Sequence, residues 1–267
     1  MHLVAAVQPM LLPGFSRVLA DVQVLPPKGL NTSGYLDLND IARHTAWAHG
    51  IMHAYAAWLG PVLLAAAFVA AYVAAWWRRA PRVAALLFLG GAGTLAALGL
   101  NQLVAHAAEE LRPYATHPHA LVLVGRANDY AFPSDHSVVA GGLTASVLLV
   151  AGGDLWRRRS ADGRGAGRAL GRVDARLVRA LAAVNVVLGL FLCFARVYVG
   201  AHYPGDVVAG YLLSSLVVLL VSLLRPLAYR AVDLVEPTAL GVLVRRPAVV
   251  SSGDGGNGPG PSGVAGT

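Results

Sequence analysis

Five polar side chains of this sequence have the types and the order that phosphoryl chemistry requires: Arg112, His136, Arg196, His202 and Asp206. Arginine binds phosphate through its planar fork of donors. A histidine followed by an aspartate, as in His202 and Asp206, is typical of a nucleophile or base that a carboxylate holds in one tautomer. His136 offers a second imidazole as general acid. The set predicts phosphoryl chemistry with a histidine nucleophile.

The segment Pro133-Ser134-Asp135-His136 opens an apolar run, which by default is a helix start capped by Ser134. The backbone amides after Ser134 also form a natural anion site. Each of these residues alone could have an ordinary structural role; a lone arginine at a membrane boundary, for example, usually anchors there by snorkelling. Two arginines, two histidines and an aspartate at the same depth in the membrane favour a functional site, since ionisable groups there are costly.

The elements that position these residues are predicted to be membrane helices. Hydrophobic residues make up 56% of the 267 residues and charged residues only 13%, about half the charged fraction of a soluble domain. Lipid is therefore the expected environment. The net charge of +7 would suggest a nucleic-acid partner in a soluble protein, but here the basic residues gather between apolar runs, so none is expected. A single cysteine excludes a disulfide framework within the chain.

Five apolar stretches have roughly the ~20 residues that a membrane-spanning helix needs. The fold class is therefore all-α, a polytopic membrane helix bundle with about five transmembrane helices plus an N-terminal amphipathic segment. The predicted spans are 55–77, 83–104, 136–156, 179–199 and 206–224. Small residues inside them suit close helix packing in lipid; they include Gly90, Gly91, Gly93, Gly141 and Gly142.

Three parts are expected: an N-terminal segment (1–54), a transmembrane domain (55–230) and a largely disordered cytoplasmic tail (231–267). Residues 35–54 are either an amphipathic helix at the membrane interface or an ordinary helix packed on the protein. Whether the first segment crosses the membrane, making six spans, stays open. The glycine- and serine-rich stretch 251–267 is predicted to be disordered.

Arginines set the expected orientation. They cluster between the first and second spans, between the third and fourth, and after the fifth, and the positive-inside rule makes that side cytoplasmic. The connections 105–135 and 200–205, which carry the candidate residues, then face outward. The prediction is a multi-pass protein of the plasma membrane with its active site outside. The arginines are Arg78, Arg79, Arg82, Arg157, Arg158, Arg159, Arg164, Arg168, Arg172, Arg176, Arg179, Arg225, Arg230, Arg245 and Arg246.

Three motifs in this order resemble the type 2 phosphatidic acid phosphatase superfamily, which also includes the vanadium-dependent haloperoxidases. Arg112-Pro113 is similar to the end of its first motif, and residues 133–136 (Pro-Ser-Asp-His) are similar to its second. Residues 195–206 (Ala-Arg-Val-Tyr-Val-Gly-Ala-His-Tyr-Pro-Gly-Asp) are similar to its third, with the spacing intact. The resemblance covers roughly 50–224 and is nearest to the bacterial undecaprenyl-diphosphatase branch.

The resemblance implies a two-step reaction without metal or other cofactor. His202, oriented by Asp206, would attack phosphorus, and His136 would protonate the leaving oxygen. Water would then hydrolyse the phosphohistidine. The phosphoryl oxygens would be bound by Arg112, Arg196, Ser134 and the backbone amide of Asp135.

The sequence departs from the family pattern at three positions. Ala105 stands where the first motif has a lysine, and His106 or Arg126 is the candidate replacement. Asp135 replaces a glycine and is compatible with a phosphate only if its side chain points away. Ala195 replaces a serine.

The implied substrate is a lipid phosphate, undecaprenyl diphosphate in the first place, with phosphatidylglycerophosphate or phosphatidate as the alternative. The partners are thus the substrate and membrane lipids, and protein partners are unknown. The haloperoxidases are soluble, so five membrane spans argue against that activity. A non-catalytic lipid-binding membrane protein is the remote alternative. Glu109 and Glu110 beside Arg112 either tune the site or form a solvated helix end, which is the favoured interpretation. The outer-loop residues His117, His119 and Asp129 are not expected to be catalytic.

Overall fold

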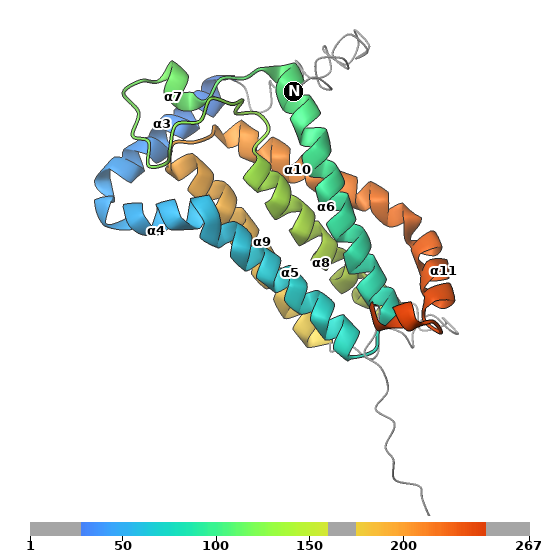
Figure 1. Cartoon of the computed structure of the whole chain (residues 1–267). Coiled ribbons are helices and arrows are strands. Elements are labelled where there is room, and N and C mark those ends of the chain that lie inside the picture. The colour runs from blue at the N-terminus through green and yellow to red at the C-terminus, as the bar shows by residue number, and fades with distance from the viewer. Residues whose placement is uncertain (1–27, 160–174, 244–267) are drawn as a thin grey trace, which may run out of the picture.

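A computed structural model describes residues 28–159 and 175–243 (Figure 1). Both described ranges are helical and contain no strand, which confirms the all-α prediction. The helices are α3 (Lys28–His44), α4 (His49–Ala54), α5 (Gly60–Trp77), α6 (Pro81–Ala108), α7 (Pro113–Thr116), α8 (Asp135–Arg159), α9 (Ala175–Tyr198), α10 (Pro204–Val221) and α11 (Arg225–Val235). Short turns of other helix types are η2 (Ala46–Ala48), η3 (Tyr55–Leu59), η5 (Ser222–Leu224) and η6 (Ala239–Leu243).

Within the described ranges, five helical stretches are long and apolar enough to cross a membrane, as predicted. Each of these stretches contains most of the residues of one predicted span. They are Ala46–Trp77, Pro81–Thr116, Asp135–Gly152, Arg176–Tyr198 and Pro204–Val235.

The helix α8 lies at the centre of the bundle and packs against α5, α6, α9 and α10 (Figure 1). Its side chains Ala140 and Val147 are fully buried in the two main core clusters. Large apolar side chains are exposed on the surrounding helices, including Phe88 and Leu95 on α6 and Leu212 on α10. This distribution is expected of a protein whose outer surface faces hydrocarbon rather than water.

Glycines let α8 and α10 approach each other closely. A Cβ at Gly141 of α8 would collide with the carbonyl oxygen of Tyr211, and a Cβ at Gly210 of α10 would lie 2.6 Å from the carbonyl oxygen of Ser134. Small residues at such crossings are the usual means of close packing between membrane helices. The first turns of α8 and α10, which carry the second and third motifs, are therefore held together.

The helix predicted over 35–54 is interrupted. It ends near Thr45, whose hydroxyl donates to the carbonyl oxygen of Ile41 at 2.7 Å. The ring of His49 contacts the carbonyl oxygen of Ala42 at 2.8 Å. These side chains occupy carbonyls at the helix end. A new helix, α4, then continues through a π turn into α5.

One face of the α3 helix packs on the protein. Tyr35 is fully buried, and Asn39 exchanges two hydrogen bonds with the backbone of Leu121, at 2.7 and 3.0 Å. Leu36 and Ile41 are exposed on the other face. A position at the membrane interface stays a prediction.

At the opposite end of the bundle, α11 packs on α6 (Figure 1). Arg82 pairs with Asp233 at 3.5 Å, and the Trp76 indole donates to the carbonyl oxygen of Val242 at 2.6 Å. The predicted boundary at residue 231 thus falls inside α11. The stretch 251–267 lies outside the described residues, as do residues 1–27.

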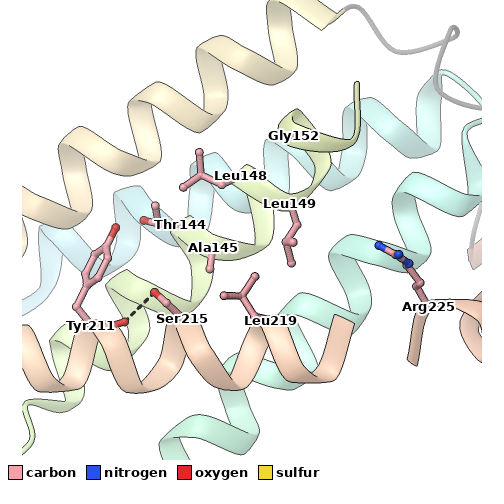
Figure 2. Close-up of a pocket in the computed structure, with 9 residues that line it drawn as sticks. All are labelled: Thr144, Ala145, Leu148, Leu149, Gly152, Tyr211, Ser215, Leu219 and Arg225. Atoms are coloured by element: carbon pink, nitrogen blue, oxygen red, sulfur yellow. Dashed lines mark hydrogen bonds between the residues drawn. The ribbon is translucent and has the colours of Figure 1, made fainter. Parts of the chain in front are cut away.

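A groove of about 710 Å³ runs along α8 and α10 toward Arg225 (Figure 2). Its lining includes three leucines, Leu148, Leu149 and Leu219. Two hydroxyl groups in the lining bond within the protein: Ser215 Oγ donates to the carbonyl oxygen of Tyr211 at 2.8 Å, and Thr144 Oγ1 donates to that of Asn185 at 3.1 Å. The groove contains no candidate catalytic group. The site lies at the other end of these helices.

The contact between α8 and α10 can be tested at Gly141. We predict that Gly141→Ala lowers the free energy of unfolding by about 1–3 kcal/mol, because the added methyl group overpacks the crossing. Gly152→Ala on the same helix is the matched control, since a Cβ there meets nothing within 4 Å. Thermal unfolding in detergent, followed by intrinsic fluorescence, distinguishes the two. Equal midpoints for both variants would contradict the packing argument.

Candidate active site

His202 lies at the centre of the polar cluster, between α9 and α10, and is 2% exposed. Its Nδ1 donates to the carbonyl oxygen of Ala131 at 2.9 Å. Its Nε2 is 3.1 Å from Arg112 Nη1 and 3.3 Å from Arg196 Nη2. Because guanidinium groups only donate hydrogen bonds, Nε2 is the acceptor. The ring is therefore held as the tautomer with a proton on Nδ1 and a lone pair on Nε2.

Burial lowers the pKa of His202 well below the ordinary value of 6.5, and the positive charges of Arg196 and Arg112 lower it further. A lowered pKa means that the ring stays neutral at pH 6.5 and is protonated only at more acidic pH. The lone pair on Nε2 is thus retained at neutral pH, as a nucleophile requires.

Asp206 lies 3.4 Å from His202, measured from Oδ2 to Nδ1. The same Oδ2 accepts a shorter hydrogen bond, 2.8 Å, from the backbone amide of Tyr203, which satisfies a donor at the start of α10. The backbone oxygen of Asp206 accepts from the amide of Ser134 at 3.1 Å. Asp206 is close enough to orient the histidine, as the sequence suggests, but Ala131 makes the shorter contact.

Arg112, in the loop after α6, is fixed by a carboxylate that sequence reasoning set aside. Its Nε and Nη2 donate to the two carboxylate oxygens of Asp129, at 2.6 and 2.8 Å. Its Nη1 donates to the carbonyl oxygen of Ala201 at 3.1 Å and faces His202. Asp129 therefore determines which edge of the guanidinium points into the site.

Two buried donors of the cluster have no protein partner among the described residues. They are Nε of Arg196, near the end of α9, and the hydroxyl of Ser134, just before α8. Nη1 of Arg196 donates to the carbonyl oxygen of Ala56 at 3.3 Å. A buried donor without a partner costs about 1–3 kcal/mol. An acceptor that reached either group would remove this cost at that group.

A cavity of about 240 Å³ opens onto the two arginines. His136 also lines it, whereas Ser134 and His202 are buried and are not among the lining residues. The two arginines and both histidines therefore lie in one cluster. The lining residues are His53, Ala57, Arg112, Tyr114, Val124, Gly125, Ala127, His136, Arg196 and Ala201.

The Asp135 side chain is directed toward α6 and does not line the cavity. Its Oδ1 accepts from Nδ2 of Asn101 at 2.7 Å and from Nε2 of Gln102 at 2.9 Å. These two amides hold the carboxylate away from the arginines. This is the orientation that a phosphate site requires at this position.

The position that lacks the first-motif lysine, Ala105, is buried in α6. His106 bonds to its own helix, with Nδ1 2.7 Å from the carbonyl oxygen of Gln102, and lies outside the cavity lining. The other candidate, Arg126, has its guanidinium carbon 5.8 Å from the centre of the Tyr114 ring, which does line the cavity.

The sequence reasoning missed Ala131, Asp129 and Asn101. Only Asp129 left a signal, as an acid in the same outer loop as an arginine. In the described part of the chain, no group of three His, Cys, Asp or Glu side chains is arranged to hold a metal ion.

Comparisons with known proteins show the family and the fold. Residues 85–230 match the family model described as PAP2 superfamily. The chain is 28% identical over 119 residues to the undecaprenyl-diphosphatase of Sulfolobus acidocaldarius, covering 45% of either chain. It is 31% identical over 152 residues to undecaprenyl-diphosphatase BcrC of Bacillus subtilis, covering 57% of this chain and 60% of the relative. It thus spans about half the length of these curated relatives.

The crystal structure of a transmembrane PAP2-type phosphatidylglycerolphosphate phosphatase from Bacillus subtilis has a similar fold. The TM-score is 0.50 at 20% identity, over 82% of this chain and 96% of that one. At this identity the likeness concerns the fold alone.

The protonation state of His202 can be measured directly. We predict that its ring titrates with a midpoint below pH 6.5, because burial and the two arginines oppose a third positive charge. Side-chain ¹⁵N spectra of histidine-labelled protein in detergent, assigned by comparison with His202→Ala, report both the midpoint and the tautomer. A midpoint at or above 6.5 would contradict the neutral ring.

Proposed function

Because the chain belongs to the PAP2 superfamily, we propose that it is a membrane phosphatase that removes the terminal phosphate of undecaprenyl diphosphate and leaves undecaprenyl phosphate. One observation carries the chemistry: two arginines converge on Nε2 of a buried, neutral His202 beside a cavity that His136 also lines. The names of the two curated relatives support the substrate.

In the first step, the terminal phosphoryl group enters the cavity and accepts the hydrogen bonds that Arg112 and Arg196 make to His202 in the free protein. This exchange frees the lone pair on Nε2, which attacks phosphorus. The bond from phosphorus to the bridging oxygen breaks, and His136 gives a proton to that oxygen. The guanidinium groups and the Ser134 hydroxyl stabilise the charge on the phosphoryl oxygens in the transition state.

In the second step, water attacks the phosphohistidine. His136 takes the proton from this water, the bond between phosphorus and Nε2 breaks, and phosphate leaves. Throughout both steps, the Ala131 carbonyl and the Asp206 carboxylate stabilise the positive charge that develops on the His202 ring. The chain's own residues supply every proton transfer.

We further propose that the site faces the outer side of the plasma membrane. The end of α5, which Arg78 and Arg79 follow, and the helix α11, which contains Arg225 and Arg230, lie at the end of the bundle away from α3 and α7 (Figure 1). The cavity residues Arg112 and Tyr114 lie at the α7 end. The positive-inside rule assigns the α11 end to the cytoplasm. The diphosphate of the proposed substrate is exposed at the outer surface after cell-wall polymerisation, so this orientation fits it.

The second candidate substrate is phosphatidylglycerophosphate, which the fold neighbour supports through its fold only. Phosphatidate belongs to the same class of phosphomonoester. A lipid-binding protein without activity would have no need for the convergent arginines and the neutral histidine. A substrate panel separates these alternatives.

The first test is phosphate release by detergent-purified protein from undecaprenyl diphosphate, phosphatidylglycerophosphate and phosphatidate, with EDTA present. We expect release from the diphosphate that persists in EDTA and is lost in His202→Ala, together with an acid-labile, base-stable phosphoenzyme in the wild type. Release only from the phosphomonoesters would keep the mechanism and change the substrate. No release from any of the three would favour the non-catalytic alternative.

If Asp129 positions Arg112, its substitution should change kcat and the affinity for phosphate in different ways. In Asp129→Asn, Arg112 loses its charged anchor, so we expect kcat to fall about tenfold. The substitution also removes a half-exposed negative charge near the bound phosphate, whose repulsion weakens phosphate binding by under about 1 kcal/mol. Inorganic phosphate should therefore bind slightly more tightly to the variant. Inhibition of the enzyme by inorganic phosphate measures this affinity. The neighbouring Asn128→Ala is the control, and an unchanged kcat in Asp129→Asn would contradict the anchoring role.

A further inference from the structure

A carboxylate already engages one of the two site arginines. Asp129 is paired with Arg112, and Asp135 adds negative potential at Arg196. A phosphomonoester can be held by the arginine donors alone. A diphosphate brings a second phosphate with further negative charge, and a further cation beside the cavity would stabilise it.

Arg126 lies where such a cation is needed. Its two neighbours in the chain, Gly125 and Ala127, both line the cavity. Its guanidinium carbon lies 5.8 Å from the centre of the Tyr114 ring, and Tyr114 also lines the cavity. None of the ion pairs between described residues involves Arg126, and its side chain is exposed.

The rim that carries Arg126 is held in place by a reciprocal pair of hydrogen bonds. The Tyr114 hydroxyl donates to the carbonyl oxygen of Ala127 at 2.8 Å and accepts from its amide at 2.9 Å. The stacked ring restricts the guanidinium, which lowers the entropy lost when it binds an anion. Only Pro113 separates Tyr114 from Arg112 in the chain. The rim is therefore attached to the segment that carries Arg112.

We propose that Arg126, stacked on Tyr114, forms a subsite for the second phosphate of a lipid diphosphate. This inference rests on the proposed function. The terminal phosphate lies against Arg112 and Arg196 and is transferred to His202. The phosphate that stays with the lipid lies at the rim against Arg126, where the exposed guanidinium stabilises the negative charge of the leaving lipid phosphate. Arg126 thereby distinguishes diphosphates from monophosphates.

The test compares a diphosphate and a monophosphate with the same tail, farnesyl diphosphate and farnesyl phosphate. In Arg126→Ala we expect kcat/KM for the diphosphate to fall about 10- to 100-fold, the range for a lost charge-assisted hydrogen bond. The value for the monophosphate should change less than about threefold. Arg126→Lys should recover part of the loss, and Asn128→Ala in the same loop should behave as the wild type.

A binding measurement separates this inference from the proposed function. Methylenediphosphonate, a diphosphate analogue that is not hydrolysed, and inorganic phosphate are titrated calorimetrically into wild type and Arg126→Ala. We expect the variant to lose affinity for the diphosphonate by about tenfold or more and to keep its affinity for phosphate. This result would support the subsite even if the wild type hydrolysed only monophosphates. Equal losses for both ligands, or no loss for either, would overturn it.

Discussion

The site depends on one buried carboxylate, that of Asp206 in the first turn of α10. A carboxylate removed from water is costly unless hydrogen bonds solvate it. Oδ2 of Asp206 accepts from the amide of Tyr203 and lies 3.4 Å from Nδ1 of His202, whereas Oδ1 has no partner among the described residues. The backbone oxygen of Asp206 accepts from the amide of Ser134, so the starts of α8 and α10 and the His202 ring all contact this one residue. Gly210 makes this possible, because any side chain there would push α8 away.

The sequence was sufficient for the spans and for the polar side chains of the three motifs, which the fold brings close together. Each candidate polar residue stands at the end of an apolar run, where an ionisable group is conspicuous, so Arg112, Arg196 and His202 could be identified without coordinates. Ala131 could not, because every residue carries a carbonyl and only the fold decides which one a histidine reaches. Asp129 shares an outer loop with Arg112, but this loop has no periodicity that would predict that the two side chains pair.

The N-terminal segment shows a different reason for failure. Its amphipathic pattern continues through residues 35–54, yet the helix ends within it, because Thr45 and His49 bond to carbonyl oxygens of the last turn. A hydrophobic pattern predicts which face of a helix is buried. It does not predict where side chains take over the backbone carbonyls and end the helix. Asp135 is a related case. Its charge looked unfavourable in the sequence, and the neighbouring amides of Asn101 and Gln102 remove the difficulty.

The lone pair of His202 is engaged by Arg112 and Arg196 in the free protein. A neutral electrophile gives these cations no reason to turn away, so it meets a shielded ring. In the mechanism that we propose, an anionic group attracts the same cations and exposes the lone pair of His202 behind them. Recognition of charge would then precede reaction, and the His202 ring would stay shielded from neutral lipids and metabolites at the membrane surface.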